Sequence, residues 1–168
     1  MTDEPAPNVP IRPEPVRPGE VAPSFDLPAV LDGGEQINVA IPCDAVDGPI
    51  LLLFYQDDGM PICTSQLKAF AQEFGLLKDA EVQVFGVNTN GLGSHARFQE
   101  RDHFPFPLIS DFHAEAVKAY GLWDADEGKS RRAVVIIAKD GKVQYVQPHF
   151  NPGNVNAIVE VFTALGLV

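Results

Sequence analysis

One stretch limits what this chain can fold into more than any other: Ile50–Phe54 is an unbroken run of apolar residues. A short run of this kind, bounded by turn residues, predicts a strand buried on both faces, as in a parallel or mixed sheet covered by helices. From Thr64 onward the apolar residues recur every three or four positions, which is the helical period. The chain therefore passes from a central strand into a helix through a polar turn that contains Asp57, Asp58 and Gly59.

Cys63 lies where this helix is expected to begin. The first amide N–H groups of a helix have no intrahelical acceptor and carry a partial positive charge, so a thiol there loses its proton more readily. Thr64 and Ser65 supply hydroxyls that can cap the same turn. Two interpretations of Cys63 stand at this point: a reactive thiolate, or one more small hydrophobic residue of the core.

Length and composition indicate one globular domain. The chain has 168 residues, of which 45% are hydrophobic and 21% charged, as is usual for a folded domain. The net charge of −11 argues against nucleic acid or an anionic membrane as a partner, because both need a basic face. The sequence has neither a signal peptide nor an apolar run of about 20 residues, so the cytoplasm is the expected location.

The cysteines and histidines do not indicate a metal site. Two cysteines, Cys43 and Cys63, are too few for a disulfide framework, and no histidine has a second ligand at metal-binding spacing. We therefore expect no metal and no other cofactor. Solvated or helix-capping roles are expected for the four histidines, which are His95, His103, His113 and His149.

The order of patterns along the chain predicts an α/β sandwich with a mixed central sheet. Residues 1–20 carry six prolines and few large apolar side chains, so we expect a disordered arm before a folded domain at residues 21–168. Turn signals predict one hairpin around residues 32–34 and another around residues 139–141. Between them, buried strands alternate with helices, including one at residues 64–78 and one capped by Ser94.

Residues 54–66, FYQDDGMPICTSQ, resemble the peroxidatic-cysteine loop of the peroxiredoxins. The nearest pattern, FYPxDxTPxCTxE, is that of the bacterioferritin comigratory protein (peroxiredoxin Q) subfamily. Further segments are similar to the family at the N-terminal opening, in PFPLISD at residues 105–111, and in YGLW at residues 120–123. The resemblance spans about residues 19–166 and implies a thioredoxin-like α/β sandwich with an N-terminal β-hairpin extension.

The resemblance also implies a catalytic pair. In the family the peroxidatic cysteine attacks the distal peroxide oxygen and becomes a sulfenic acid, a role that falls to Cys63. Arg132 aligns with an arginine that precedes a strand and supplies the positive charge and two parallel donors. Pro61 and Thr64 match the supporting positions of the loop.

Three positions depart from the family pattern: Gln56 replaces a proline, Met60 a threonine, and Gln66 a frequent glutamate. The family threonine orients the peroxide through its hydroxyl, whereas Met60 offers only a weak thioether acceptor. Loss of one preorganised partner of this kind typically costs about 100-fold in rate. These departures predict a weakened or altered site.

The sequence offers no nearby cysteine to resolve the sulfenic acid. Peroxiredoxin Q proteins often place a resolving cysteine five residues after the first, where this chain has Lys68. Cys43 precedes the central strand and is expected near its far end, so we expect it to be structural or incidental. A C-x-x-C exchange motif is absent as well, because Met60 stands where it needs a cysteine. The resemblance therefore implies a one-cysteine enzyme that uses an external thiol, either a thioredoxin-like protein or a low-molecular-weight thiol.

Two functional hypotheses remain. The first is a thiol peroxidase that reduces hydrogen peroxide or organic hydroperoxides through Cys63 and Arg132. The second is a peroxiredoxin-like redox sensor or binding module with little peroxidase turnover. A homodimer is the assembly that the fold analogy suggests.

Overall fold

The structure is a computed structural model that describes residues 10–41 and 48–168. Within them the chain alternates strands and helices in the order that the sequence predicts, with an additional short helix and an additional small hairpin. The elements are β1 (Phe25–Val30), β2 (Gln36–Ile41), β3 (Ile50–Phe54), α1 (Pro61–Ala71), α2 (Phe74–Asp79), β4 (Gln83–Asn88), α3 (Leu92–Asp102), β5 (Leu108–Ser110), α4 (Glu115–Ala119), β6 (Trp123–Asp124), β7 (Lys129–Ser130), β8 (Ala133–Ile137), β9 (Val143–Gln147) and α5 (Val155–Ala164).

A seven-stranded mixed sheet forms the centre, in the order β2-β1-β5-β4-β3-β8-β9. Strands β3, β4 and β5 run parallel, whereas β8 pairs antiparallel with β3. The carboxyl ends of the three parallel strands therefore meet at one edge of the sheet, together with the start of β8. In open α/β sheets this edge is where ligand sites gather.

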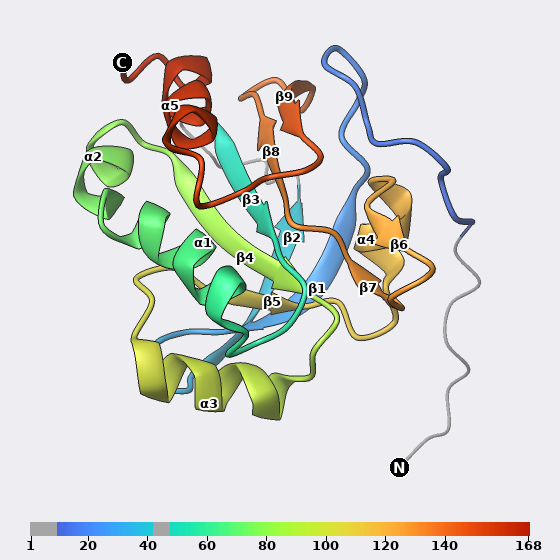
Figure 1. Ribbon diagram of the computed structural model, residues 1–168, viewed down its shortest axis with the longest axis vertical. Helices are drawn as coiled ribbons and strands as arrows, with labels where there is room; N and C mark the ends of the chain where they lie inside the picture. The colour runs from blue at the N-terminus through green and yellow to red at the C-terminus, as the bar shows by residue number, and fades with distance from the viewer. Residues whose placement is uncertain (1–9, 42–47) are drawn as a thin grey trace.

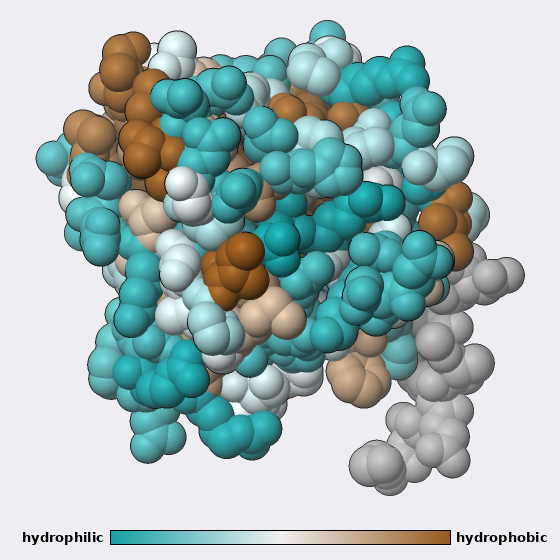
Figure 2. Space-filling view, viewed as in Figure 1, coloured by the Kyte–Doolittle hydropathy of each residue, from teal (hydrophilic) through white to brown (hydrophobic). Residues whose placement is uncertain are grey.

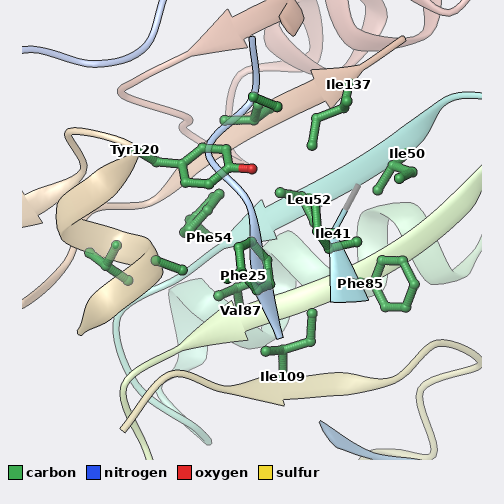
Figure 3. Packing of buried hydrophobic residues seen from close by; sticks show 14 of the residues in the cluster. Phe25, Ile41, Ile50, Leu52, Phe54, Phe85, Val87, Ile109, Tyr120 and Ile137 are labelled. Atoms are coloured by element: carbon green, nitrogen blue, oxygen red, sulfur yellow. The ribbon is translucent and has the colours of Figure 1, made fainter. Parts of the chain in front are cut away.

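Helices cover both faces of the sheet, as Figure 1 shows. On one face of the sheet, a hydrophobic core lies between the strands and helices α1, α2, α3 and α5. A second core lies on the opposite face, which α4 covers. In the second core, Leu52 and Phe54 project from β3 toward Tyr120 (Figure 3). Every residue of β3 is buried, so the run of apolar residues is the two-sided central strand that the sequence predicts.

The helix expected at residues 64–78 differs from the structure, where α1 ends at Ala71 and α2 begins at Phe74. The N–H of Glu73 donates to the carbonyl of Phe70, only three residues back, so the chain tightens at the junction. Helix α1 also starts earlier than expected, with Pro61 as its first residue. Proline suits that position because its fixed φ and missing N–H cost nothing there.

Part of the expected disordered arm is packed against the domain. Val16 is buried, and its N–H donates to the carbonyl of Tyr120. Gly121 lies so close to this segment that a Cβ on it would be 2.0 Å from the carbonyl oxygen of Glu14. Residues 10–20 therefore follow the domain surface, while residues 1–9 lie outside the described part of the chain.

The surface seen in Figure 2 is mainly hydrophilic, as the excess of acidic residues suggests. Hydrophobic side chains gather at the upper left, over α5, where Val155 and Val159 are exposed. Among the described residues, no helix is long and apolar enough to cross a membrane.

Candidate active site

Cys63 is the third residue of α1 and is fully buried in the core between this helix and the sheet. The first intrahelical hydrogen bond of α1 joins the N–H of Thr64 to the carbonyl of Met60, at 2.8 Å. The amides before Thr64 therefore precede the helical ladder and present the positive end of the helix dipole to the thiol. The predicted position of Cys63, at the start of a helix that follows the central strand, is confirmed.

Met60 packs directly on the thiol, with its Sδ 3.7 Å from Sγ of Cys63. Its backbone is extended, at φ −63° and ψ 128°, which is the conformation favoured before a proline. Met60 is the N-cap of α1 and makes no side-chain capping bond. Capping by Thr64 or Ser65 was therefore a wrong prediction, because both residues lie inside the helix.

The loop between β3 and α1 turns sharply at Gly59, whose φ is +77°. Residues other than glycine rarely adopt this backbone conformation. Thr64 lies on the outer side of the helix and accepts a 3.5 Å hydrogen bond from Arg101. Of the supporting residues of the loop, Pro61 and Met60 thus shape the helix start, whereas Thr64 faces α3.

Arg132 reaches the same loop from the other side. It directly precedes β8, whose first residue, Ala133, pairs with Phe54 at the end of β3. Nη1 of Arg132 donates to Oε1 of Gln56 at 2.8 Å. Its Nε–H is buried and has no hydrogen-bond partner in the described part of the chain.

Gln66 follows Cys63 by one helical turn and is also fully buried. Its Nε2 donates to the carbonyl of Phe54 at 3.0 Å, so the side chain reaches the end of β3. Its Oε1 is buried and accepts no hydrogen bond from any described residue. The structure thus brings Gln56, Gln66 and Arg132 together around the end of β3.

A pocket of about 310 Å³ opens beside this group. Arg132, Gln56 and Ile62 line it on the side of the loop between β3 and α1. The rest of its wall comes from the β6–β7 region and from the chain after β9, namely Asp124, Arg131, His149, Phe150 and Asn151. Cys63 itself has no exposed surface, so a ligand in this pocket reaches the thiol only when a covering side chain moves.

On the opposite side of β3, Asp58 organises a second polar group. Its carboxylate accepts hydrogen bonds from Tyr55 at 2.7 Å, Ser94 at 2.7 Å and Asn88 at 3.1 Å, and contacts Nδ1 of His95 at 2.6 Å. The other ring nitrogen of His95 lies 3.0 Å from the carbonyl oxygen of Ile109. These bonds fix the loop before Cys63 to β4, β5 and α3.

This second group corrects two expectations. His95 is fully buried, so the solvated or capping role expected for it was wrong. Ser94 was expected to cap its helix, but the N-cap of α3 is Gly91 and the Ser94 hydroxyl binds Asp58. The signal that could have found the group is the polar ends of two adjacent parallel strands, since Asp58 follows β3 and Asn88 ends β4.

Burial by itself would raise the pKa of the Asp58 carboxyl, but the hydrogen bond and positive charge of His95 outweigh it, so the pKa lies below its ordinary value. Burial, followed by the nearby Asp58 charge, raises the pKa of Tyr55 well above its ordinary value. Tyr55 is therefore a neutral donor to Asp58 at neutral pH. Asp57, the other acidic residue of this loop, forms an ion pair with Lys129 of β7. Neither carboxylate has Cys63 as a hydrogen-bond partner.

The remaining candidate residues contribute less to this picture. Cys43 lies outside the described residues, so its predicted structural or incidental role stays a prediction. Lys68, at the position of the resolving cysteine, pairs with Asp102 at 3.3 Å. In residues 10–41 and 48–168, no cluster of histidine, cysteine, aspartate and glutamate could hold a metal ion.

Comparison with known proteins places the chain in a family and agrees with the fold. The chain matches the AhpC/TSA family over residues 18–146. It is 30% identical to peroxiredoxin Bcp of Escherichia coli K12 over 151 residues, which cover 86% of this chain and 94% of that protein.

Solved structures give the same picture at the level of the fold. Mycobacterium tuberculosis AhpC has a TM-score of 0.77 at 21% identity, covering 90% of this chain and 99% of its own. Peroxidoxin BcpB of the same organism also has a TM-score of 0.77, at 22% identity, covering 90% and 97%. The predicted peroxiredoxin-type α/β sandwich is thereby confirmed, and the chain belongs to the AhpC/TSA family, which is the family of the peroxiredoxins.

Proposed function

We propose that this protein is a one-cysteine thiol peroxidase that reduces hydrogen peroxide or organic hydroperoxides through Cys63. The observation that carries the proposal is the convergence of Cys63, at the start of α1, and Arg132, before β8, on the end of β3. A cysteine attacks a peroxide as its thiolate. The negative charge that develops on the departing oxygen needs hydrogen-bond donors that are already in place. The guanidinium of Arg132 is such a donor, and Cys63 lies at the positive end of the α1 dipole.

The reaction follows from these groups. Sγ of the Cys63 thiolate bonds to the distal peroxide oxygen, the O–O bond breaks, and its electron pair leaves with the proximal oxygen. Arg132 stabilises that oxyanion until it takes a proton and departs as water or an alcohol. Cys63 is left as a sulfenic acid, which is the two-electron oxidised form of the thiol.

Return to the thiol needs two equivalents of an external thiol. The first forms a mixed disulfide with Cys63 and releases water, and the second releases the reduced Cys63 and a disulfide product. The presence of Lys68, paired with Asp102, at the usual resolving position supports this route. A thioredoxin-like protein or a low-molecular-weight thiol of a reducing compartment such as the cytoplasm can fill the role.

A second candidate function, a redox sensor or binding module, is favoured by one specific observation. The side chain of Met60 lies against Sγ of a fully buried Cys63. A thiol covered in this way reacts slowly unless the loop opens. Under this alternative, the fold and the thiol are retained and turnover is given up.

The test is stopped-flow oxidation of the reduced protein by hydrogen peroxide and by cumene hydroperoxide, with trapping of the sulfenic acid and mass spectrometry. Peroxidase function predicts oxidation about 100-fold or more faster than free cysteine, since preorganised donors contribute at least that much. The sulfenic acid should be on Cys63, disappear in Cys63→Ser and persist in the matched control Cys43→Ser. The sensor or binding function would instead be supported if the wild type reacted no faster than free cysteine and the Met60→Thr variant reacted much faster.

A further inference from the structure

Two buried polar atoms near the end of β3 are unsatisfied, and they are complementary. Oε1 of Gln66 is an acceptor without a donor, and the Nε–H of Arg132 is a donor without an acceptor, among the described residues. Buried polar groups of folded proteins are nearly always hydrogen-bonded, so each exception needs an explanation. The third unsatisfied atom, Oδ1 of Asp111, lies before α4 and away from this group.

The strand geometry places the Gln66 amide and Arg132 on the same side of β3. The N–H of Tyr55 donates to Val87 of β4, and successive residues of a strand point their backbone groups to alternate sides. The carbonyl of Phe54 therefore faces β8. Gln66 donates to that carbonyl, and Arg132 directly precedes the β8 residue that pairs with Phe54.

The orientation of the Gln66 amide is fixed by its partner. A backbone carbonyl can only accept, so the NH₂ group of Gln66 must face Phe54 and the oxygen is left over. Arg132 can only donate. The site thus offers one acceptor and one donor, with Sγ of Cys63 one helical turn from Gln66 on the same face of α1.

A hydroperoxide has the matching chemistry. Its O–H needs an acceptor and its second oxygen accepts from a donor, whereas Met60 cannot supply the hydroxyl found in the family. We propose that Gln66 contacts the substrate and takes over this role: Oε1 accepts the hydroperoxide O–H while Arg132 donates to the departing oxygen. The selected substrates are neutral hydroperoxides, ROOH, because an alkylperoxide anion, ROO⁻, has no proton to donate to Gln66.

The reacting atoms keep these contacts through the step. The distal oxygen, with its proton still donated to Gln66, forms the new bond to Sγ and remains on Cys63 as the sulfenic acid. The O–O bond breaks toward the proximal oxygen, which holds the electron pair beside Arg132 and takes its proton from water. This role of Gln66 rests on the proposed peroxidase function.

The test compares two reactions of Cys63: oxidation by hydrogen peroxide and alkylation by iodoacetamide, which needs the thiolate but no peroxide contact. Gln66→Met has a similar volume and no comparable acceptor, so it should lower the oxidation rate about 100-fold and leave alkylation within about twofold. Adding Met60→Thr should restore at least about tenfold of the lost rate, because the threonine hydroxyl replaces the acceptor. The matched control is Gln72→Met, an exposed glutamine after the same helix, which should change neither reaction.

Other outcomes would assign Gln66 a different role or remove the peroxidase function. If Gln66→Met slows oxidation and alkylation together, Gln66 acts on the thiol or the fold and not on the peroxide. An unchanged oxidation rate in Gln66→Met, beside a fast wild type, removes only the role of Gln66. A wild type no faster than free cysteine removes the peroxidase function, and the role of Gln66 with it.

Discussion

Two groups of buried polar residues flank β3 where it ends at the β3–α1 loop, and they differ in how many of their polar atoms have hydrogen-bond partners. On the β4 side, both carboxylate oxygens of Asp58 are hydrogen-bonded, and both ring nitrogens of His95 have partners. On the β8 side, Gln66 and Arg132 each keep one buried atom without a partner among the described residues. A complete network holds a structure in place, whereas an incomplete one favours a molecule that can complete it.

The largest expected effect is on stability, in the complete group. Asp58→Asn removes a buried charge that faces His95 and takes donors from three further side chains, so it should cost about 3–5 kcal/mol in the free energy of unfolding. Urea denaturation measures this cost. Asp57→Asn is the matched control, since its ion pair with Lys129 is partly solvated and its loss should matter far less. Equal losses in the two variants would show that Asp58 does not hold the loop.

The same carboxylate should make stability fall in acid. The pKa of Asp58 is lower in the folded protein than its ordinary value of 3.8. The stability that the ionised Asp58 carboxylate contributes is therefore complete at pH values above its pKa in the unfolded chain. That stability is lost as the pH falls through the lower pKa of Asp58 in the folded protein. Unfolding free energies measured from pH 7 to pH 3 should decline less steeply in Asp58→Asn than in the wild type. Parallel curves for the two proteins would contradict the depressed pKa.

A smaller loss is expected from Tyr55→Phe. The variant keeps the buried ring and removes only the hydroxyl that donates to Asp58 at 2.7 Å. A hydrogen bond to a charged acceptor contributes about 1.5–3 kcal/mol, so unfolding should become easier by about 2 kcal/mol. Tyr145→Phe is the control, because its hydroxyl makes a longer, exposed contact to Glu160. If the two variants lost the same stability, the Tyr55 hydroxyl would have no special part in the network.

The smallest effect on stability is expected in the incomplete group. Gln66→Met loses one hydrogen bond to Phe54 but also removes a buried acceptor without a partner. The two changes oppose each other, so the free energy of unfolding should change by less than about 1 kcal/mol. Thermal unfolding of the variant beside Asp58→Asn checks the contrast. A loss as large as that of Asp58→Asn would mean that Gln66 is a structural residue.

Local sequence patterns predict the frame of this site. The apolar run at β3 and the change to a helical period place the thiol at a helix start without any long-range information. The sharp turns at residues 32–34 and 139–141 likewise predict the two hairpins. Each of these features depends on neighbours in the chain, which is what periodicity and turn chemistry describe.

The polar partners could not be predicted in the same way. Asp58 and His95 lie 37 residues apart, and no periodic pattern joins them. Their contact exists because β3 and β4 are adjacent parallel strands whose ends meet. Which polar atoms of Gln66 and Arg132 lack partners likewise depends on how the strands are paired. The type of a residue does not reveal which of its possible hydrogen bonds are made in the fold.

Peroxide recognition by this site is measured most directly as a ratio of two rates for Cys63 in one reduced preparation: oxidation by hydrogen peroxide over alkylation by iodoacetamide. Thiolate reactivity raises both rates, so the ratio isolates recognition of the peroxide by the surrounding donors and acceptors. We predict a ratio about 100-fold or more above that of free cysteine. A ratio equal to that of free cysteine would contradict this prediction, because the site would then hold a thiol without selecting a peroxide.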